Sequence, residues 1–159
     1  MKATFLIVDD EAAIGRIIAF QLENSDYACE LATSGAEALS KASMKDFEVV
    51  LLDIDMPVMS GLQVLEKIVN DHPDTAVVML TGIDNTATAV DAMRKGAYDY
   101  ILKPFNLDDL TIRVGMALDK RRLILENRDY ERRLEQKVKI QASQIAEISE
   151  DLSKRPDVI

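Results

Sequence analysis

An uninterrupted apolar run that stops at a carboxylate constrains the fold of this chain more than any other feature. The run is Val49-Val50-Leu51-Leu52, and Asp53 follows it directly. Consecutive apolar and β-branched residues favour a strand that is buried on both faces, as in a parallel sheet. Ligands of open α/β sheets bind just beyond the carboxyl ends of the strands. We therefore expect Asp53 at the mouth of a site, although a single aspartate at a strand end is also a common cap or turn residue.

Strand and helix patterns alternate along the chain. Apolar runs predict five strands, near residues 4–8, 28–31, 49–53, 76–80 and 98–102. Helical spacing and capping signals predict a helix after each strand, near residues 11–24, 34–43, 60–69, 84–96 and from 106 onward. Ser34 followed by Glu37 is typical of a capping box at the second helix. Right-handed crossovers then predict an α/β fold, a doubly wound five-stranded parallel sheet with helices on both faces.

Composition excludes several classes of function. The chain has 159 residues, 48 % of them hydrophobic, which suits one domain plus an appendage. A single cysteine, Cys29, and a single histidine, His72, argue against a disulfide framework and a zinc site. Residues 1–118 carry 9 Lys and Arg against 19 Asp and Glu, which argues against nonspecific nucleic-acid binding. We expect a cytoplasmic protein without membrane contact, because the chain shows no membrane-length apolar run and no signal-peptide layout.

Reactive side chains stand at the ends of four predicted strands. They are Asp9 and Asp10 after the first strand, Asp53 after the third, Thr81 after the fourth and Lys103 after the fifth. Taken singly, Thr81 could be a cap and Lys103 a solvated charge. Parallel strands share one carboxyl edge, however, so the five side chains are expected to meet in one pocket.

Three clustered carboxylates repel one another and require a cation. Oxygen ligands without histidine or cysteine favour a hard ion, and we expect magnesium (Mg2+). A metal-bound carboxylate cluster beside a lysine and a hydroxyl suits a phosphoryl group, whose charge the cations would offset. Asp53 could then act as a nucleophile that forms an aspartyl-phosphate.

Four segments of the chain resemble a known family, the receiver domains of two-component response regulators. The matching segments are Leu6-Ile-Val-Asp-Asp-Glu11, Asp53-Ile-Asp-Met-Pro-Val-Met-Ser-Gly61, Leu80-Thr-Gly82 and Tyr100-Ile-Leu-Lys-Pro-Phe105. The resemblance covers residues 3–118 and is to receivers of the chemotaxis-regulator type. It implies the flavodoxin-like strand order 2-1-3-4-5.

The resemblance also implies a role for each site residue. Asp53 would accept a phosphoryl group from a sensor histidine kinase or a phosphotransfer protein. Asp9, Asp10, Asp53 and the backbone carbonyl of Asp55 would hold Mg2+. Thr81 and Lys103 would bind the phosphoryl oxygens, Tyr100 would change rotamer on activation, and the Lys103–Pro104 peptide would be cis. Such a chain is a phosphoacceptor module and not an enzyme, apart from its own phosphorylation and dephosphorylation.

The acidic motif is compatible with two other interpretations. Asp53-Ile-Asp55 also resembles the nucleophile motif of haloacid-dehalogenase-type phosphatases. Those enzymes place their metal-binding acidic pair after the lysine motif, whereas Asp9 and Asp10 precede Asp53 here. A degenerate receiver acting only as a scaffold is the third reading, and the full set of site residues speaks against it.

Residues 119–159 form a second predicted region, a coiled-coil helix or linker toward a missing or absent output domain. Apolar residues recur there by threes and fours, at Leu123, Tyr130, Leu134, Val138, Ile145, Ile148 and Leu152, if Asn127 and Gln141 fill the gaps. A solvated single helix is the alternative, but a narrow apolar stripe on so long a helix has little to bury unless it meets another helix. We expect a parallel homodimer through residues 119–154, with Pro156 ending the helix. The segment resembles the signalling helices that join receivers to output domains such as cyclic-dinucleotide phosphodiesterases and sensor kinases, which would make the chain part of a longer protein.

Overall fold

The computed structural model describes residues 2–82 and 86–154. The chain divides into two compact units, Met1–Arg121 and Arg122–Ile159. All five strands belong to the first unit, and the described part of the second unit is helical.

Strands and helices alternate through the first unit as the sequence predicts. The elements are β1 (Thr4–Val8), α1 (Ala12–Asn24), β2 (Ala28–Ala32), α2 (Gly35–Met44), β3 (Val49–Asp53), α3 (Gly61–Asp71), β4 (Ala76–Gly82), α4 (Thr86–Arg94), β5 (Asp99–Lys103) and α5 (Leu107–Lys154). The fifth strand lies one residue later than predicted, so that it includes Lys103. The predicted helix start at Asp84 or Asn85 and the predicted helix end at Pro156 lie outside the described residues.

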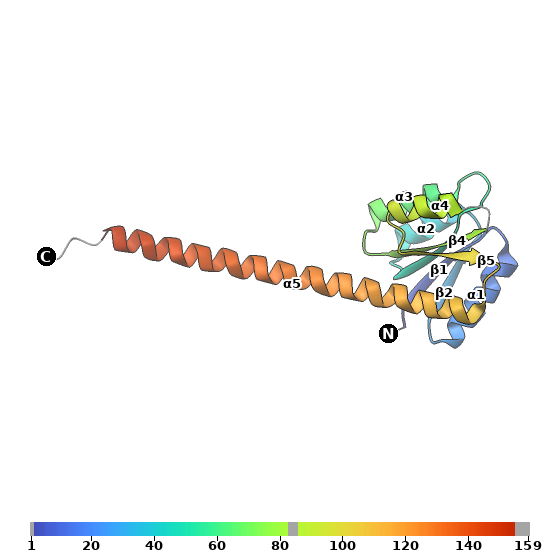
Figure 1. Cartoon of the computed structure of the whole chain (residues 1–159), viewed down its shortest axis with the longest axis horizontal. Helices are drawn as coiled ribbons and strands as arrows, with labels where there is room; N and C mark the ends of the chain where they lie inside the picture. Colours follow the sequence, from blue (N-terminus) through green and yellow to red (C-terminus); the bar gives the residue numbers. More distant parts are fainter. Residues whose placement is uncertain (1, 83–85, 155–159) are drawn as a thin grey trace. The chain divides into compact units, whose positions relative to one another are not determined.

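The five strands form one sheet in the order β2-β1-β3-β4-β5, and every neighbouring pair is parallel. The predicted fold class and strand order are therefore confirmed. In Figure 1, α2, α3 and α4 cover one face of the sheet, and α1 covers the other together with the first turns of α5. Because all strands run the same way, their carboxyl ends lie along a single edge.

Two separate hydrophobic cores lie on the two faces of the sheet. Val50 and Leu52 of β3 pack into the core beneath α2, α3 and α4. Val49 and Leu51 of the same strand pack into the core formed with α1 and α5. These four side chains are buried, which explains why β3 reads as a continuous apolar run and not as an alternating one.

The helix starts differ in how their first amide groups are satisfied. Ser34 caps α2 and accepts a hydrogen bond from the Glu37 amide. The Glu37 carboxylate accepts from Thr33 instead of returning to Ser34, so the capping box predicted there is only half formed. A complete box stands at α3, where Ser60 and Gln63 bond each other's backbone amides. This second box fixes the start of α3 immediately after the loop that follows β3.

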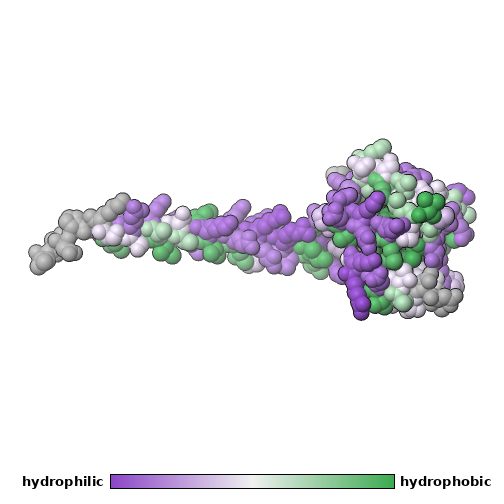
Figure 2. Space-filling view, turned by 90° about the horizontal axis from the view of Figure 1, so that it is seen from above, coloured by the Kyte–Doolittle hydropathy of each residue, from purple (hydrophilic) through white to green (hydrophobic). Residues whose placement is uncertain are grey.

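The second unit consists of the continuation of α5. Most of its large apolar side chains are solvent-exposed and lie among charged residues, and apolar patches recur along the helix in Figure 2. Among the described residues, no helix combines the length and apolar character that a membrane crossing requires.

Candidate functional site

Three carboxylates converge at the carboxyl edge of the sheet. Asp9 and Asp10 follow β1, and Asp53 is the last residue of the neighbouring strand β3. One oxygen from each lies within 4.8 Å of the others. Asp9 and Asp53 are 1 % and 3 % exposed, whereas Asp10 faces solvent. Two buried carboxylates with an exposed third form a cluster that is open on one side.

The Lys103 ammonium reaches this cluster from β5, two strands away from β3. Its Nζ lies 3.0 Å from Asp9 Oδ2 and 3.4 Å from Asp53 Oδ2. Backbone amides satisfy the other carboxylate oxygens: the Glu11 amide donates to Asp9 Oδ1 at 2.9 Å, and the Asp55 amide donates to Asp53 Oδ1 at 3.2 Å. The cluster is thus held by one ammonium and by the two loops that follow β1 and β3.

Burial dominates the electrostatics of Asp53. It raises the pKa of the Asp53 carboxyl to about 6, with the Asp9 charge adding to the rise and Lys103 and the Asp55 amide opposing it. Burial alone would lower the pKa of Lys103, but its hydrogen bond to Asp9 and the charges of Asp53 and Asp9 raise the pKa above its ordinary value. Lys103 is therefore a permanent cation beside a carboxylate that is costly to ionise.

Thr81 and Tyr100 lie on the strands that border the cluster. Thr81 is fully buried near the end of β4, and its hydroxyl donates to the Gly82 carbonyl at 3.3 Å. Tyr100 is half-buried on β5 and packs against the core beneath α2, α3 and α4. Thr81 thus shares the edge of the sheet with the carboxylates, whereas Tyr100 lies three residues before Lys103 on the same strand. The Lys103–Pro104 peptide is cis, as the resemblance implied.

Gly61 ends the loop after β3, as the sequence predicts, and the structure shows why a glycine is needed there. A Cβ at this glycine would lie 2.2 Å from the Asp53 carbonyl oxygen and 2.7 Å from Ile54 Cα. The Gly61 amide donates to the Ile54 carbonyl at 2.9 Å. The start of α3 can approach the strand end this closely only because position 61 lacks a side chain. Its place at the end of the Asp53–Gly61 motif was the available signal.

Arg113 of α5 is a residue that sequence reasoning missed. Its Nη1 lies 3.2 Å from Asp99 Oδ2 and 3.4 Å from the Tyr100 carbonyl oxygen, and its Nε donates to Asp109 at 3.2 Å. The Asp109–Arg113 spacing on one helix could be read from the sequence. The contacts with β5 could not, because they join elements by their three-dimensional packing. Arg113 connects the strand that carries Tyr100 and Lys103 to α5.

The donor set of the cluster fits a hard divalent cation. All its ligand atoms are carboxylate oxygens, and their mutual distances suit one ion held by two or three of them with water completing the shell. The acidic triad is the arrangement that the resemblance to receiver domains implies for a Mg2+ site. Burial is the main cause of the raised pKa of Asp53 and the Asp9 charge adds to it; a cation there would favour the ionised carboxylates against both effects.

Comparison with known proteins agrees with the resemblance found in the sequence. The family model of the response regulator receiver domain matches residues 5–115. The chain is 38 % identical to the nitrogen assimilation regulatory protein NtrX of Azorhizobium caulinodans over 131 residues, which are 81 % of this chain and 29 % of that protein. It is 36 % identical to the uncharacterized transcriptional regulatory protein YkoG of Bacillus subtilis, over 74 % of this chain and 51 % of that protein. The chain thus spans about half or less of these curated relatives.

A solved structure extends the likeness to three dimensions. The crystal structure of the receiver domain of NtrX from Brucella abortus matches with a TM-score of 0.70 and 37 % identity, over 72 % of this chain and 98 % of that one. The likeness therefore extends over nearly all of that domain.

Proposed function

The chain belongs to the response regulator receiver family, and from that premise we propose that Asp53 accepts a phosphoryl group from the phosphohistidine of a sensor histidine kinase or phosphotransfer protein. A receiver domain is a phosphoacceptor signalling module and not a catalytic enzyme. We therefore do not assign the chain the function of a haloacid-dehalogenase-type hydrolase. The observation that carries the proposal is the convergence of Asp9, Asp53 and Lys103 at one edge of the sheet.

The transfer forms a bond between an Asp53 carboxylate oxygen and phosphorus, while the bond between phosphorus and the donor's imidazole nitrogen breaks. Asp53 must be ionised to attack. Its pKa is raised only to about 6, so the carboxylate form still predominates at neutral pH. The Lys103 ammonium is within reach of the same carboxylate and would bind an oxygen of the transferred group. The Thr81 hydroxyl, at the same edge, would bind another.

Asp9, Asp10 and Asp53 would hold Mg2+, with the Asp55 backbone carbonyl as a further ligand. When bound, the ion supplies positive charge that offsets the phosphoryl oxygens. The Tyr100 side chain would then change rotamer, because Tyr100 and Lys103 lie on the same strand, β5, and its backbone couples them. The phosphorylated site would favour one of two states already present in the free protein.

Acetyl phosphate with Mg2+ tests the chemistry. We expect intact mass to show one added phosphoryl group, and none on Asp53→Asn. Asp71→Asn is the matched control, because Asp71 is an exposed aspartate that ends α3. Full labelling of the Asp53→Asn variant would contradict the assignment.

We further propose that two chains pair in parallel through residues 119–154, and that this helix relays the signal to a partner or output domain in the cytoplasm. The support is a row of exposed apolar side chains on α5: Leu134 (44 % exposed), Val138 (61 %), Ile145 (67 %), Ile148 (59 %) and Leu152 (58 %). Covering each one stabilises the assembly by about 1.5–3 kcal/mol at full burial.

Light scattering on the whole chain tests the pairing. A dimeric mass is expected for the natural sequence, and a monomeric mass for Ile145→Glu, which places a charge in the seam. Ile140→Glu is the control, because Ile140 is similarly exposed (59 %) but lies outside the seam. A monomeric mass for the natural chain at tens of micromolar, or equal effects of the two variants, would refute the seam.

A further inference from the structure

Two apolar stripes overlap on the first part of the second unit, at residues 123–134 of α5. From Leu134 to Leu152 the seam of α5 advances by alternating steps of 4 and 3 residues, through Leu134, Val138, Gln141, Ile145, Ile148 and Leu152. Continuing this alternation toward the N-terminus leads to Glu131, Asn127 and Ile124. Two other apolar residues, Tyr130 and Leu123, lie beside Asn127 on its other side. Asn127 therefore belongs to two possible seams.

The two seams require different rotations of the helix. At about 100° per residue, Leu123 and Tyr130 lie roughly 50° to one side of Asn127, and Ile124 and Glu131 lie roughly 50° to the other. The midline of each seam lies between Asn127 and one of the two pairs. Moving the midline from one side of Asn127 to the other therefore takes a rotation of about 50°. Each pair completes a seam with Asn127, but both cannot face a partner helix at once.

Each seam has one advantage and one cost. The seam with Leu123 and Tyr130 buries two large apolar side chains, which are 57 % and 61 % exposed on the single helix. It contains consecutive steps of 4 residues around Leu134, which unwind a coiled coil locally. The seam with Ile124 keeps the regular heptad but places the Glu131 carboxylates of the two chains opposite each other. Each seam therefore has a cost that the other lacks.

Contacts within the first unit tie α5 to the strand that carries Lys103. Arg113 binds Asp99 and the Tyr100 carbonyl oxygen, and the Lys120 ammonium lies 5.0 Å from the centre of the Tyr98 ring. Tyr98 directly precedes β5. A displacement of β5 therefore acts on α5 at two points along the helix.

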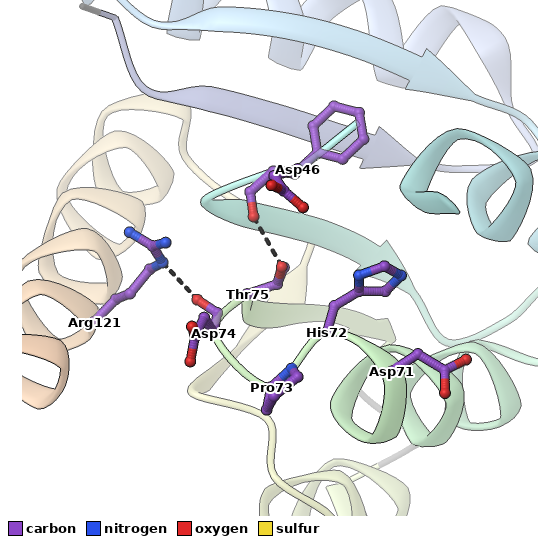
Figure 3. A pocket seen from close by; sticks show the side chains of 8 residues that line it. Asp46, Asp71, His72, Pro73, Asp74, Thr75 and Arg121 are labelled. Carbon is purple, nitrogen blue, oxygen red and sulfur yellow. Dashed lines mark hydrogen bonds between the residues drawn. The ribbon is translucent and has the colours of Figure 1, made fainter. Parts of the chain in front are cut away.

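The Arg121 guanidinium provides a third attachment, at the loop before β4. Its Nε donates to the Asp74 carbonyl, as Figure 3 shows, at the side of a pocket of about 270 Å³ that is also lined by Pro73 and Thr75. The helical backbone continues from Arg121 through Asn127 without interruption. The residues that choose between the seams thus follow Arg121 in the same helix.

We propose that paired α5 helices switch between the Leu123–Tyr130 seam and the Ile124–Glu131 seam, and that the phosphoacceptor site selects the seam through β5 and Arg113. This inference rests on the proposed parallel dimer. The occupant of either stripe is a second copy of the same helix, and the downstream seam from Leu134 to Leu152 holds the two chains together in both states.

Disulfide cross-linking of the whole chain distinguishes the two seams. Tyr130→Cys and Glu131→Cys are each introduced in a Cys29→Ala background and oxidised with and without Mg2+ and beryllofluoride, a phosphoryl mimic. We expect the ratio of cross-linked yields at the two positions to change by about threefold or more on addition of the mimic. Ile145→Cys lies in the shared seam and should cross-link equally in both conditions.

The outcomes separate this inference from the dimer itself. An unchanged ratio together with efficient cross-linking at Ile145→Cys would overturn the seam switch and leave the dimer. Failure of Ile145→Cys to cross-link would overturn the dimer and the switch with it.

Two further variants sharpen the test. Glu131→Leu removes the charge from the regular seam, so cross-linking at Tyr130→Cys should fall several-fold in the resting state. Arg113→Ala should abolish the response of the ratio while amide chemical shifts still report binding of beryllofluoride. A full response in Arg113→Ala would contradict the proposed route.

Discussion

The Lys103 ammonium lies 3.0 Å from Asp9 Oδ2 and only 3.4 Å from Asp53 Oδ2, so a single cation holds two buried carboxylates. The nearer partner is Asp9, in the loop after β1, and not the proposed phosphoacceptor Asp53. Lys103 therefore has two electrostatic effects in the unphosphorylated chain. It offsets the charge of the acidic cluster, and we expect it to compete with a metal ion for the Asp9 and Asp53 carboxylates.

Removing the Lys103 charge should strengthen metal binding while weakening phosphorylation. With Lys103→Gln, the carboxylates retain their charge and lose their competitor, so we expect Mg2+ affinity to rise by about tenfold. Isothermal titration calorimetry measures the affinity, and acetyl phosphate labelling should fall in parallel. Lys45→Gln is the control, because Lys45 pairs with Glu30 on the surface. Weaker Mg2+ binding by Lys103→Gln would contradict this account.

Asp53→Asn should stabilise the metal-free fold in a pH-dependent way. The pKa of Asp53 is about 6 in the folded chain against 3.8 ordinarily, so ionised Asp53 destabilises the fold. The advantage of asparagine should be about 1–2 kcal/mol above pH 7, after allowance for solvent screening, because one pKa unit corresponds to about 1.4 kcal/mol. It should shrink as the pH falls through 6 and vanish near 4, where both states are protonated.

Urea unfolding in the presence of a chelator measures this difference between pH 4 and 8. Asp71→Asn serves again as the control for a general loss of negative charge. A stability gain for Asp53→Asn that is independent of pH would show that burial of the charge is not its cause.

Gly61→Ala should destabilise the fold by about 2 kcal/mol or more, because its Cβ meets the backbone of Asp53 and Ile54 and neither can move freely. Gly115→Ala is the matched comparison. There the nearest atom to a new Cβ is the Tyr27 hydroxyl oxygen at 3.9 Å, and Gly115 lies within α5. That variant should gain about 0.5–1 kcal/mol from helix propensity. Urea midpoints of opposite sign are expected, and equal midpoints would refute the close approach at Gly61.

The Cys29 thiol should react slowly with alkylating reagents. Burial, with a contribution from the Glu23 charge, raises its pKa to about 12, so little thiolate is present at pH 8. Alkylation in the folded chain should be slower by orders of magnitude than in urea, where the thiol has an ordinary pKa. Rapid modification of the native protein at pH 8 would show that the thiol is not protected.

Local patterns were sufficient to predict the sheet and the positions of the acidic residues. The apolar run before Asp53 predicts a strand buried on both faces, and the structure confirms this strand. The same logic places Thr81 and Lys103 at the common edge. What could not be predicted depends on single contacts between distant elements. The bond from Arg121 to the Asp74 carbonyl joins residues 47 positions apart and has no periodic signature.

The division of β3 between two cores has a consequence for how this family can vary. Val49 and Leu51 pack on one side of the sheet, and Val50 and Leu52 pack on the other. Deleting one residue from this strand would move every later side chain to the opposite face and withdraw the Asp53 carboxylate from its partners. Insertions and deletions that survive selection should therefore fall in the loops at the amino edge of the sheet, while the length of β3 stays constant across homologues that differ at most other positions.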